Sequence, residues 1–181
     1  MVKKIVLALL AAIVLLLVFA TTRPDSFRVE RSISIKADPA RVYTLLNDFH
    51  YFPSWSPWHN LDAGMKVIHS GAPSGQGAVY EWSGNDVVGA GRMEILKTLP
   101  NTSLTVKLDF LKPFERHNTT EYLLSTSNAG STTMTWAMYG PSPFISKVMG
   151  VFVSMDSVIG KDFERGLVNL KGVAEKLAAT P

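Results

Sequence analysis

His117 and Glu121 are the residues of this chain whose types and spacing could support proton transfer. They lie four residues apart in a stretch that alternates like a β-strand, so both side chains point to the same side, with Thr119 between them. A histidine oriented by a carboxylate can act as a general base. The opposite side of this stretch is as able to face the interior, so the orientation of the pair stays open. His117 and Glu121 are therefore weak candidates for catalytic residues.

Other chemistries find little support in the sequence. The four histidines, His50, His59, His69 and His117, lie on separate segments without the spacing of metal ligands, and the chain has no cysteine. No phosphate-binding glycine loop, nucleophile elbow or zinc-protease helix is present. The formal net charge of +3 includes Lys3 and Lys4 at the N-terminus, and the remaining chain is nearly neutral without a basic cluster. We expect no metal, no cofactor and no nucleic-acid partner.

Aromatic and methionine side chains are stronger candidates, for binding an apolar ligand. Two segments each place several of them on one face of a predicted strand, and others flank a Ser-Pro pair or lie on the apolar stripe of the last helix. Such side chains form an adaptable apolar surface if they face a cavity. The predicted ligand-binding residues are Trp55, Trp58, Tyr80, Trp82, Met134, Trp136, Met138 and Phe163. The alternative is that these residues fill an ordinary core, where aromatic side chains are also common.

The N-terminus has the composition of a membrane-spanning helix. Ile5–Ala20 contains no charge, and with the two following threonines the run spans about 27 Å as a helix, slightly less than a hydrocarbon core of about 30 Å. Lys3 and Lys4 predict a cytoplasmic N-terminus and a single-pass protein whose domain lies outside the cytoplasm. The alternative is a cleaved signal peptide and a secreted or periplasmic domain. We divide the chain into an anchor or signal peptide (1–22), a linker (23–26) and one domain (27–178).

The sequence of the domain predicts one strand, two short helices, six strands and one long helix, in this order. Phe27–Lys36 alternates as a half-buried strand with one anomaly at Arg31, Asp38-Pro39 begins a helix, and Phe49–Trp58 fits a second short helix and a loop. The six further strands are predicted at Met65–His69, Ala78–Ser83, Val87–Leu99, Leu104–Phe110, Glu115–Ser127 and Ser131–Tyr139. The last two are joined by a turn at Asn128-Ala129-Gly130, and turns this short favour antiparallel pairing.

The last helix is predicted from about Pro143 to Ala178. We expect one or two of its four glycines to mark a kink or a close backbone approach. A long antiparallel sheet must curl and cover one face, and this helix is the element large enough to cover it. The result is an α+β fold of β-α-α-β6-α order, in which a curved antiparallel sheet of about seven strands wraps around the C-terminal helix. An apolar cavity between the two is a usual consequence.

Four motifs make this order resemble the SRPBCC superfamily, which includes START, Bet v 1-like and polyketide cyclase/dehydrase-like proteins. They are Val29-Glu30-Arg31-Ser32-Ile33, Ala37-Asp38-Pro39-Ala40-Arg41-Val42-Tyr43, Trp55-Ser56-Pro57-Trp58 and Asp162-Phe163-Glu164-Arg165-Gly166-Leu167. The resemblance covers residues 27–177, is greatest to bacterial proteins with an N-terminal membrane segment, and implies the helix-grip fold. Because that fold hosts binding, transport and catalysis alike, it does not imply one activity.

Three functional hypotheses follow. The sequence favours membrane-tethered binding of an apolar small molecule or lipid in an internal cavity, without catalysis. The alternatives are a polyketide cyclase/dehydrase-like enzyme that uses His117 and Glu121, and an interaction module with a filled core. The identity of the ligand and the oligomeric state do not follow from the sequence.

Overall fold

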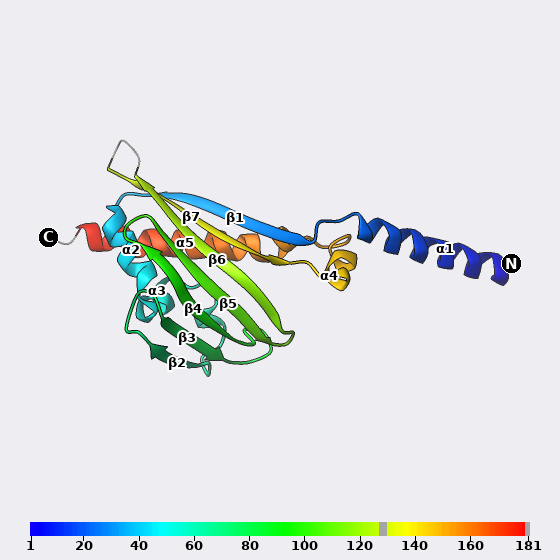
Figure 1. Ribbon diagram of the computed structural model, residues 1–181, viewed down its shortest axis with the longest axis horizontal. Coiled ribbons are helices and arrows are strands. Elements are labelled where there is room, and N and C mark those ends of the chain that lie inside the picture. The colour runs from blue at the N-terminus through cyan, green and yellow to red at the C-terminus, as the bar shows by residue number, and fades with distance from the viewer. Residues whose placement is uncertain (127–129, 180–181) are drawn as a thin grey trace.

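The computed structural model describes residues 1–126 and 130–179. It contains one seven-stranded antiparallel sheet in the order β1-β7-β6-β5-β4-β3-β2 (Figure 1). The strands are β1 (Ser26–Ile35), β2 (Lys66–Gly71), β3 (Ala78–Ser83), β4 (Ala90–Leu99), β5 (Ser103–Lys112), β6 (Arg116–Thr126) and β7 (Thr132–Pro141). The helices are α1 (Val2–Thr21), α2 (Pro39–Asn47), α3 (Phe52–Trp55), α4 (Phe144–Met149) and α5 (Met155–Ala179), with short 3₁₀ turns at Phe49–Tyr51 and His59–Leu61. The predicted α+β helix-grip architecture is confirmed.

The sheet curves around α5, and β1 is held to that helix along its length (Figure 1). Val29 and Ile35 of β1 are buried, as the alternation predicts. Arg31 points to the same side and reaches the helix, where its guanidinium donates hydrogen bonds to Asp156 and Glu164 over 2.7 and 2.8 Å. The anomalous charge in the predicted strand is therefore explained by two ion pairs with α5.

The prediction of one continuous C-terminal helix is wrong at its beginning, because the chain leaves the helical path between α4 and α5. Gly150 ends α4, and its N–H donates to the Ser146 carbonyl over 2.8 Å. The Ser154 hydroxyl accepts a hydrogen bond from the Ser157 N–H over 3.1 Å and so caps the start of α5. A glycine followed by a capping serine thus separates the two helices.

Strand β4 begins at Ala90, three residues later than predicted. The Asn85 side chain accepts hydrogen bonds from the N–H groups of Val87 and Val88 over 2.9 and 3.2 Å, which holds these residues in a turn. The predicted strand end at Ser127 and the turn residues Asn128 and Ala129 lie outside the described residues.

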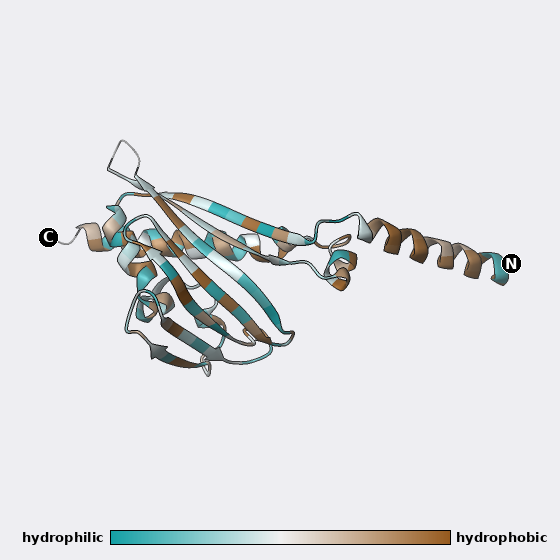
Figure 2. Cartoon of the chain, in the orientation of Figure 1, coloured by the Kyte–Doolittle hydropathy of each residue, from teal (hydrophilic) through white to brown (hydrophobic). Residues whose placement is uncertain are grey.

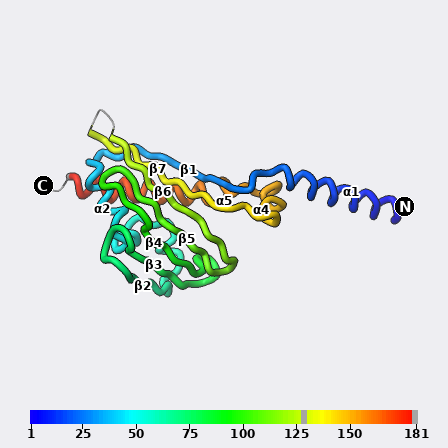
Figure 3. The backbone as a smooth tube through the Cα atoms, viewed as in Figure 1, coloured from blue at the N-terminus to red at the C-terminus, as the bar shows by residue number. Residues whose placement is uncertain are grey.

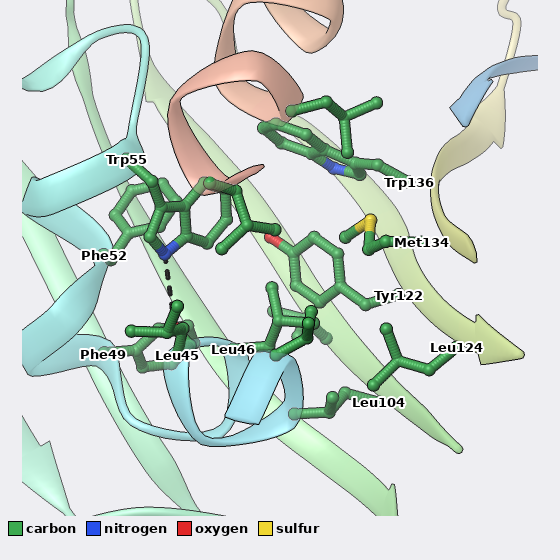
Figure 4. Close-up of a cluster of buried hydrophobic side chains, with 14 of the residues drawn as sticks. Leu45, Leu46, Phe49, Phe52, Trp55, Leu104, Tyr122, Leu124, Met134 and Trp136 are labelled. Carbon is green, nitrogen blue, oxygen red and sulfur yellow. Dashed lines mark hydrogen bonds between the residues drawn. The ribbon is translucent and has the colours of Figure 1, made fainter. Parts of the chain in front are cut away.

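The core lies between the concave face of the sheet and helices α2, α3 and α5, as the close-up in Figure 4 shows. Alternating apolar and polar residues along the strands give the banded pattern of Figure 2. Trp55 ties α3 to α2, because its Nε1–H donates to the Leu45 carbonyl over 3.2 Å. Leu45 lies in the last turn of α2, whose carbonyls have no partner within the helix.

Helix α1 projects from the domain at the end where α4 lies, so the two termini are at opposite ends of the molecule (Figures 1 and 3). Its 20 residues reach about 30 Å, the thickness of a hydrocarbon core, and all but Ala20 are at least partly exposed. Figure 2 shows hydrophobic residues along most of this helix, with a hydrophilic N-terminal end. Arg23 donates a hydrogen bond to the Gly150 carbonyl, and Lys147 pairs with Asp25, so the base of α1 is joined to α4.

Candidate ligand cavity

An apolar cavity of about 160 Å³ lies between the sheet, the first turns of α5 and the segment 52–65. Half of the lining residues are inward-facing residues of β3 to β7, and the other half come from α3, the loop after it, the β3–β4 turn and α5. The lining residues are Phe52, Ser56, Trp58, His59, Met65, Tyr80, Trp82, Val87, Val88, Met93, Leu108, Phe110, Thr120, Tyr122, Trp136, Met138, Ile159 and Phe163.

Trp136 of β7 is the centre of an aromatic cluster on this wall. Its ring stacks on Phe163 of α5 with centroids 4.1 Å apart and an angle of 9° between the planes. Trp58 meets the same ring edge-on at 5.8 Å. On the helix side, a Cβ atom at Gly166 would lie only 2.6 Å from Trp136 Cζ3, so a glycine is needed for the ring to fit. The close approach that the helix glycines led us to expect occurs here.

Two polar atoms on the wall have no hydrogen-bond partner in the described part of the chain. They are the Trp136 Nε1–H and the His59 Nδ1, and both are buried. Native structures pair nearly all buried polar groups, so an unpaired one calls for an explanation. Both atoms have almost no accessible surface, so they lie behind the wall and do not face the free space of the cavity.

The remaining polar groups of the wall are neutral. Burial raises the pKa of the Tyr80 hydroxyl to about 12 and raises that of Tyr122 further, so both phenols stay protonated at neutral pH. None of the lining residues is Asp, Glu, Lys or Arg. The cavity can thus enclose an uncharged molecule but has no charged group to bind an ion.

The cavity reaches the surface between the loop 59–65 and the β3–β4 turn. Val87, on the rim, is 73% exposed. Asp62 joins the two sides of this opening, because its carboxylate accepts hydrogen bonds from the N–H groups of Asn85 and Gly64 over 2.7 and 2.9 Å. Ile159, in the first turns of α5, also lines the cavity, so this part of the wall is near the end of α5 that follows α4.

The structure places six of the eight predicted ligand-binding residues on the cavity wall, namely Trp58, Tyr80, Trp82, Trp136, Met138 and Phe163. Trp55 and Met134 lie in the core behind it, where Trp55 meets the Trp136 ring edge-on at 5.5 Å. Sequence reasoning missed Met93, Leu108 and Phe110, although the alternation along their strands was a signal for the inner face. It also missed Thr120 and Tyr122, because the inward face of β6 was left open.

His117 and Glu121 lie on the outer face of the sheet, away from the cavity, and do not contact each other. His117 Nδ1 is 2.7 Å from Asp109 Oδ1, and Glu121 accepts a hydrogen bond from the Tyr139 hydroxyl over 3.1 Å. Burial opposes ionisation of Asp109, but hydrogen bonds from Lys107 and His117 outweigh it and lower the pKa of this carboxyl. We interpret the group as a stabilising contact between strands. No cluster of three or more potential metal ligands occurs among the described residues.

Comparison with known proteins agrees with the fold. The family model described as "Polyketide cyclase / dehydrase and lipid transport" matches residues 26–175. No curated protein matches the sequence.

Solved structures share the architecture at low sequence identity. The Aha1 dimer from Colwellia psychrerythraea is 16% identical, with a TM-score of 0.60 over 82% of this chain and 96% of that one. Major latex-like protein 151 from Panax ginseng is 15% identical, with a TM-score of 0.60 over 83% of this chain and 99% of that one. The di-domain ARO/CYC StfQ of the steffimycin biosynthetic pathway is 14% identical, with a TM-score of 0.65 over 86% of this chain and 52% of that one. At these identities the likeness extends to the fold alone.

Proposed function

Because this chain belongs to the polyketide cyclase / dehydrase and lipid transport family, we propose that it is a membrane-tethered protein that holds an apolar small molecule in its internal cavity. The observation that carries the proposal is the cavity itself, enclosed by aromatic and methionine side chains between the sheet and α5.

The volume of the cavity limits what it holds. Sites for drug-sized ligands usually measure about 300–1,000 Å³. An engineered protein cavity of roughly 150 Å³ stays dry and binds benzene. At about 160 Å³, the present cavity fits one ring, or one end of a longer molecule whose remainder leaves through the opening near Val87.

Helix α1 and its surroundings support the tether. The helix is long and apolar enough to cross a bilayer, and Lys3 and Lys4 favour an N-terminus in the cytoplasm and a domain outside it. Next to its base, the α4–α5 region exposes large apolar side chains, among them Phe152 at 73% and Met149 at 64%. Such a patch beside a spanning helix fits the interfacial region of the same bilayer. An apolar ligand that dissolves in the bilayer would then have a short path to the cavity.

A methionine-methyl NMR titration tests the proposal on the full-length chain in lipid nanodiscs. With benzene as the probe, we expect saturable shifts of Met65, Met93 and Met138, whose side chains line the cavity. Met149 lies outside it and is exposed, so its signal should change only in proportion to the benzene dissolved in the lipid. Changes that never saturate at the cavity methionines would contradict the proposal.

Two substitutions on β6 provide a matched control. Thr120 faces the cavity and Thr119 faces outward, so the same change to Phe fills the cavity at one position and leaves it open at the other. We expect Thr120→Phe to abolish the saturable shifts and Thr119→Phe to retain them. Retention of full binding in Thr120→Phe would place the ligand elsewhere.

One observation favours an enzyme as the second candidate, namely that the cavity wall includes His59, whose imidazole has one nitrogen without a partner among the described residues. Imidazole is the commonest general acid–base group. A single-ring test substrate is 3-hydroxycyclohexanone, which loses water to form cyclohexenone when a base removes the proton next to the carbonyl. Enone formation that is catalysed by the wild type and lost in His59→Ala would establish this activity. Equal rates with and without protein would exclude it for this substrate.

A further inference from the structure

The end of the sheet next to α1 also carries the β5–β6 turn. Strand β1 begins at Ser26, shortly after α1, and pairs there with Pro141 at the end of β7. Strand β6 begins at the same end of the sheet, because Thr119, near its start, pairs with Tyr139 near the end of β7. The β5–β6 turn therefore lies at the end of the domain where α1 and α4 are found (Figures 1 and 3).

The β3–β4 turn lies beside the β5–β6 turn. Ala90, the first residue of β4, pairs with Lys112 at the end of β5, and a Cβ atom at Gly89 would lie 2.3 Å from the Lys112 carbonyl oxygen. Each turn exposes a large apolar side chain, Val87 at 73% and Phe114 at 72%. Large apolar side chains that gather on a surface indicate an interaction site.

The backbone of the β3–β4 turn is held in place, so the exposure of Val87 does not come from a loose loop. The Gly84 N–H donates to the Gly89 carbonyl over 2.9 Å, and the Trp82 Nε1–H donates to the Val88 carbonyl over 3.0 Å. Val87 also borders the cavity. A surface that covers the tip of this turn would therefore lie next to the cavity opening.

We propose that the β3–β4 and β5–β6 turns form a second bilayer contact, in addition to the α4–α5 region, and that this contact brings the cavity opening at Val87 to the membrane surface. The inference rests on the proposed function, because it requires α1 to span the bilayer. Only residues 22–25 separate α1 from β1, and four residues reach at most about 14 Å. Arg23 and Asp25, within this link, are bonded to the α4 segment. This end of the sheet therefore stays close to the bilayer.

The charges near the two tips favour a contact that depends on burial of apolar side chains. Lys112 and Arg116 lie close in sequence to Phe114, but Asp86 and Glu115 offset their charge. An anionic membrane surface would therefore give little net attraction. Apolar side chains that enter the boundary between headgroups and acyl chains stabilise such a contact without it. We expect the turns to contact a bilayer of neutral, zwitterionic lipid.

Fluorescence quenching tests this contact on the full-length chain in phosphatidylcholine nanodiscs. The chain has no cysteine, so Leu111→Cys, just before the β5–β6 turn, provides a single site for a fluorophore. Leu99→Cys is the matched control. The two leucines are 54% and 53% exposed, but Leu99 ends β4 at the opposite end of the sheet. Each label would be exposed to a lipid-borne nitroxide quencher and, separately, to aqueous iodide.

We expect the lipid quencher to act several-fold more strongly on the Leu111 label than on the Leu99 label, and iodide to show the reverse order. Equal quenching of both labels by iodide would overturn the inference. Protection of the Leu111 label from both quenchers would also overturn it, because a protein, such as a second copy of this chain, would then cover the turns.

A substitution shows whether the exposed phenylalanine carries the contact. Phe114→Asp should reduce lipid quenching of the Leu111 label several-fold, because a carboxylate is unfavourable in the bilayer boundary. Leu123→Asp is the control, since Leu123 is exposed on the outer face of β6, and it should retain the quenching. Unchanged quenching in Phe114→Asp would contradict the proposed contact.

A label at Phe152→Cys, in the α4–α5 region, separates this inference from the proposed function. Lipid quenching at Phe152 without lipid quenching at Leu111 would overturn the inference and leave the proposed function intact. No lipid quenching at either site would overturn the inference and remove the arrangement of the domain against the bilayer. Ligand binding is measured independently by the benzene titration of the cavity methionines, whose failure would remove the proposed function whatever the labels show.

Discussion

Replacing Trp136 or Trp55 by Phe removes the same atoms from two buried sites, yet we expect very different effects on stability. The two side chains are 3% and 2% exposed, so the losses of buried area and the new voids are similar. The hydrogen bonding differs. Trp55 donates to the Leu45 carbonyl over 3.2 Å, whereas the Trp136 N–H has no partner in the described part of the chain.

The magnitude follows from these two states. Trp55→Phe loses a hydrogen bond with a net value of about 1 kcal/mol and strands a carbonyl at the end of α2. Trp136→Phe removes a buried donor whose lack of a partner costs about 1–3 kcal/mol in the folded state. We therefore expect Trp55→Phe to destabilise the protein by about 2–4 kcal/mol more than Trp136→Phe does, in the absence of ligand.

Urea unfolding of the two full-length variants, followed by circular dichroism in the same detergent, gives this difference from the midpoints and slopes. Ligand must be removed first, because a bound molecule adds to apparent stability. Equal free energies of unfolding, within about 0.5 kcal/mol, would refute the reasoning, since they would mean that the Trp136 donor is already satisfied, for example by a buried water.

Three further perturbations test other parts of the account. Gly166→Ala places a methyl 2.6 Å from an indole carbon and should lower the melting temperature, whereas Gly172→Ala, with nothing within 4 Å, should raise it slightly; the reverse order would contradict the assigned helix packing. Asp62→Ala removes the hydrogen bonds across the opening and should increase the release rate of a bound probe several-fold. NMR exchange measures this rate, and the chemical shifts of the bound state should stay unchanged. An unchanged release rate would show that the ligand leaves by another route. A nitroxide label attached to Phe152→Cys should be accessible to oxygen dissolved in the lipid, whereas a label on Leu123→Cys should be accessible to nickel in the aqueous phase. Aqueous exposure of both labels would contradict contact between the Phe152 patch and the bilayer interface.

Much of the fold follows from local patterns in the sequence. Alternation alone gives the inner face of β1 and the positions of the central strands, and Asp38-Pro39 gives the start of α2. A kink at one of the helix glycines was expected, and α4 does end at Gly150, but a complete break was not predicted, because Gly150 and Ser154 act as a stop and a start only through hydrogen bonds to neighbouring turns. The late start of β4 has the same kind of cause, since it depends on where the Asn85 side chain bonds.

The candidate site was harder to predict than the fold. Met134, Trp136 and Met138 share one face of β7, but only the latter two border the cavity, and Met134 is fully buried in the core. A filled core and a cavity wall have the same pattern of apolar residues in the sequence. Whether a space remains depends on how closely α5 packs on the sheet. The unpaired state of the Trp136 donor is also a property of the assembled wall. His117 and Glu121 share a face as predicted, yet each has a different partner on the outside of the sheet.

Native mass spectrometry of the full-length protein, extracted from its own membranes, tests the central claim most directly. We predict one bound apolar small molecule per chain that is released on denaturation and is absent from Thr120→Phe but present on Thr119→Phe. A bare wild-type protein, still bare after incubation with a total lipid extract, would contradict the claim that this cavity holds an apolar ligand.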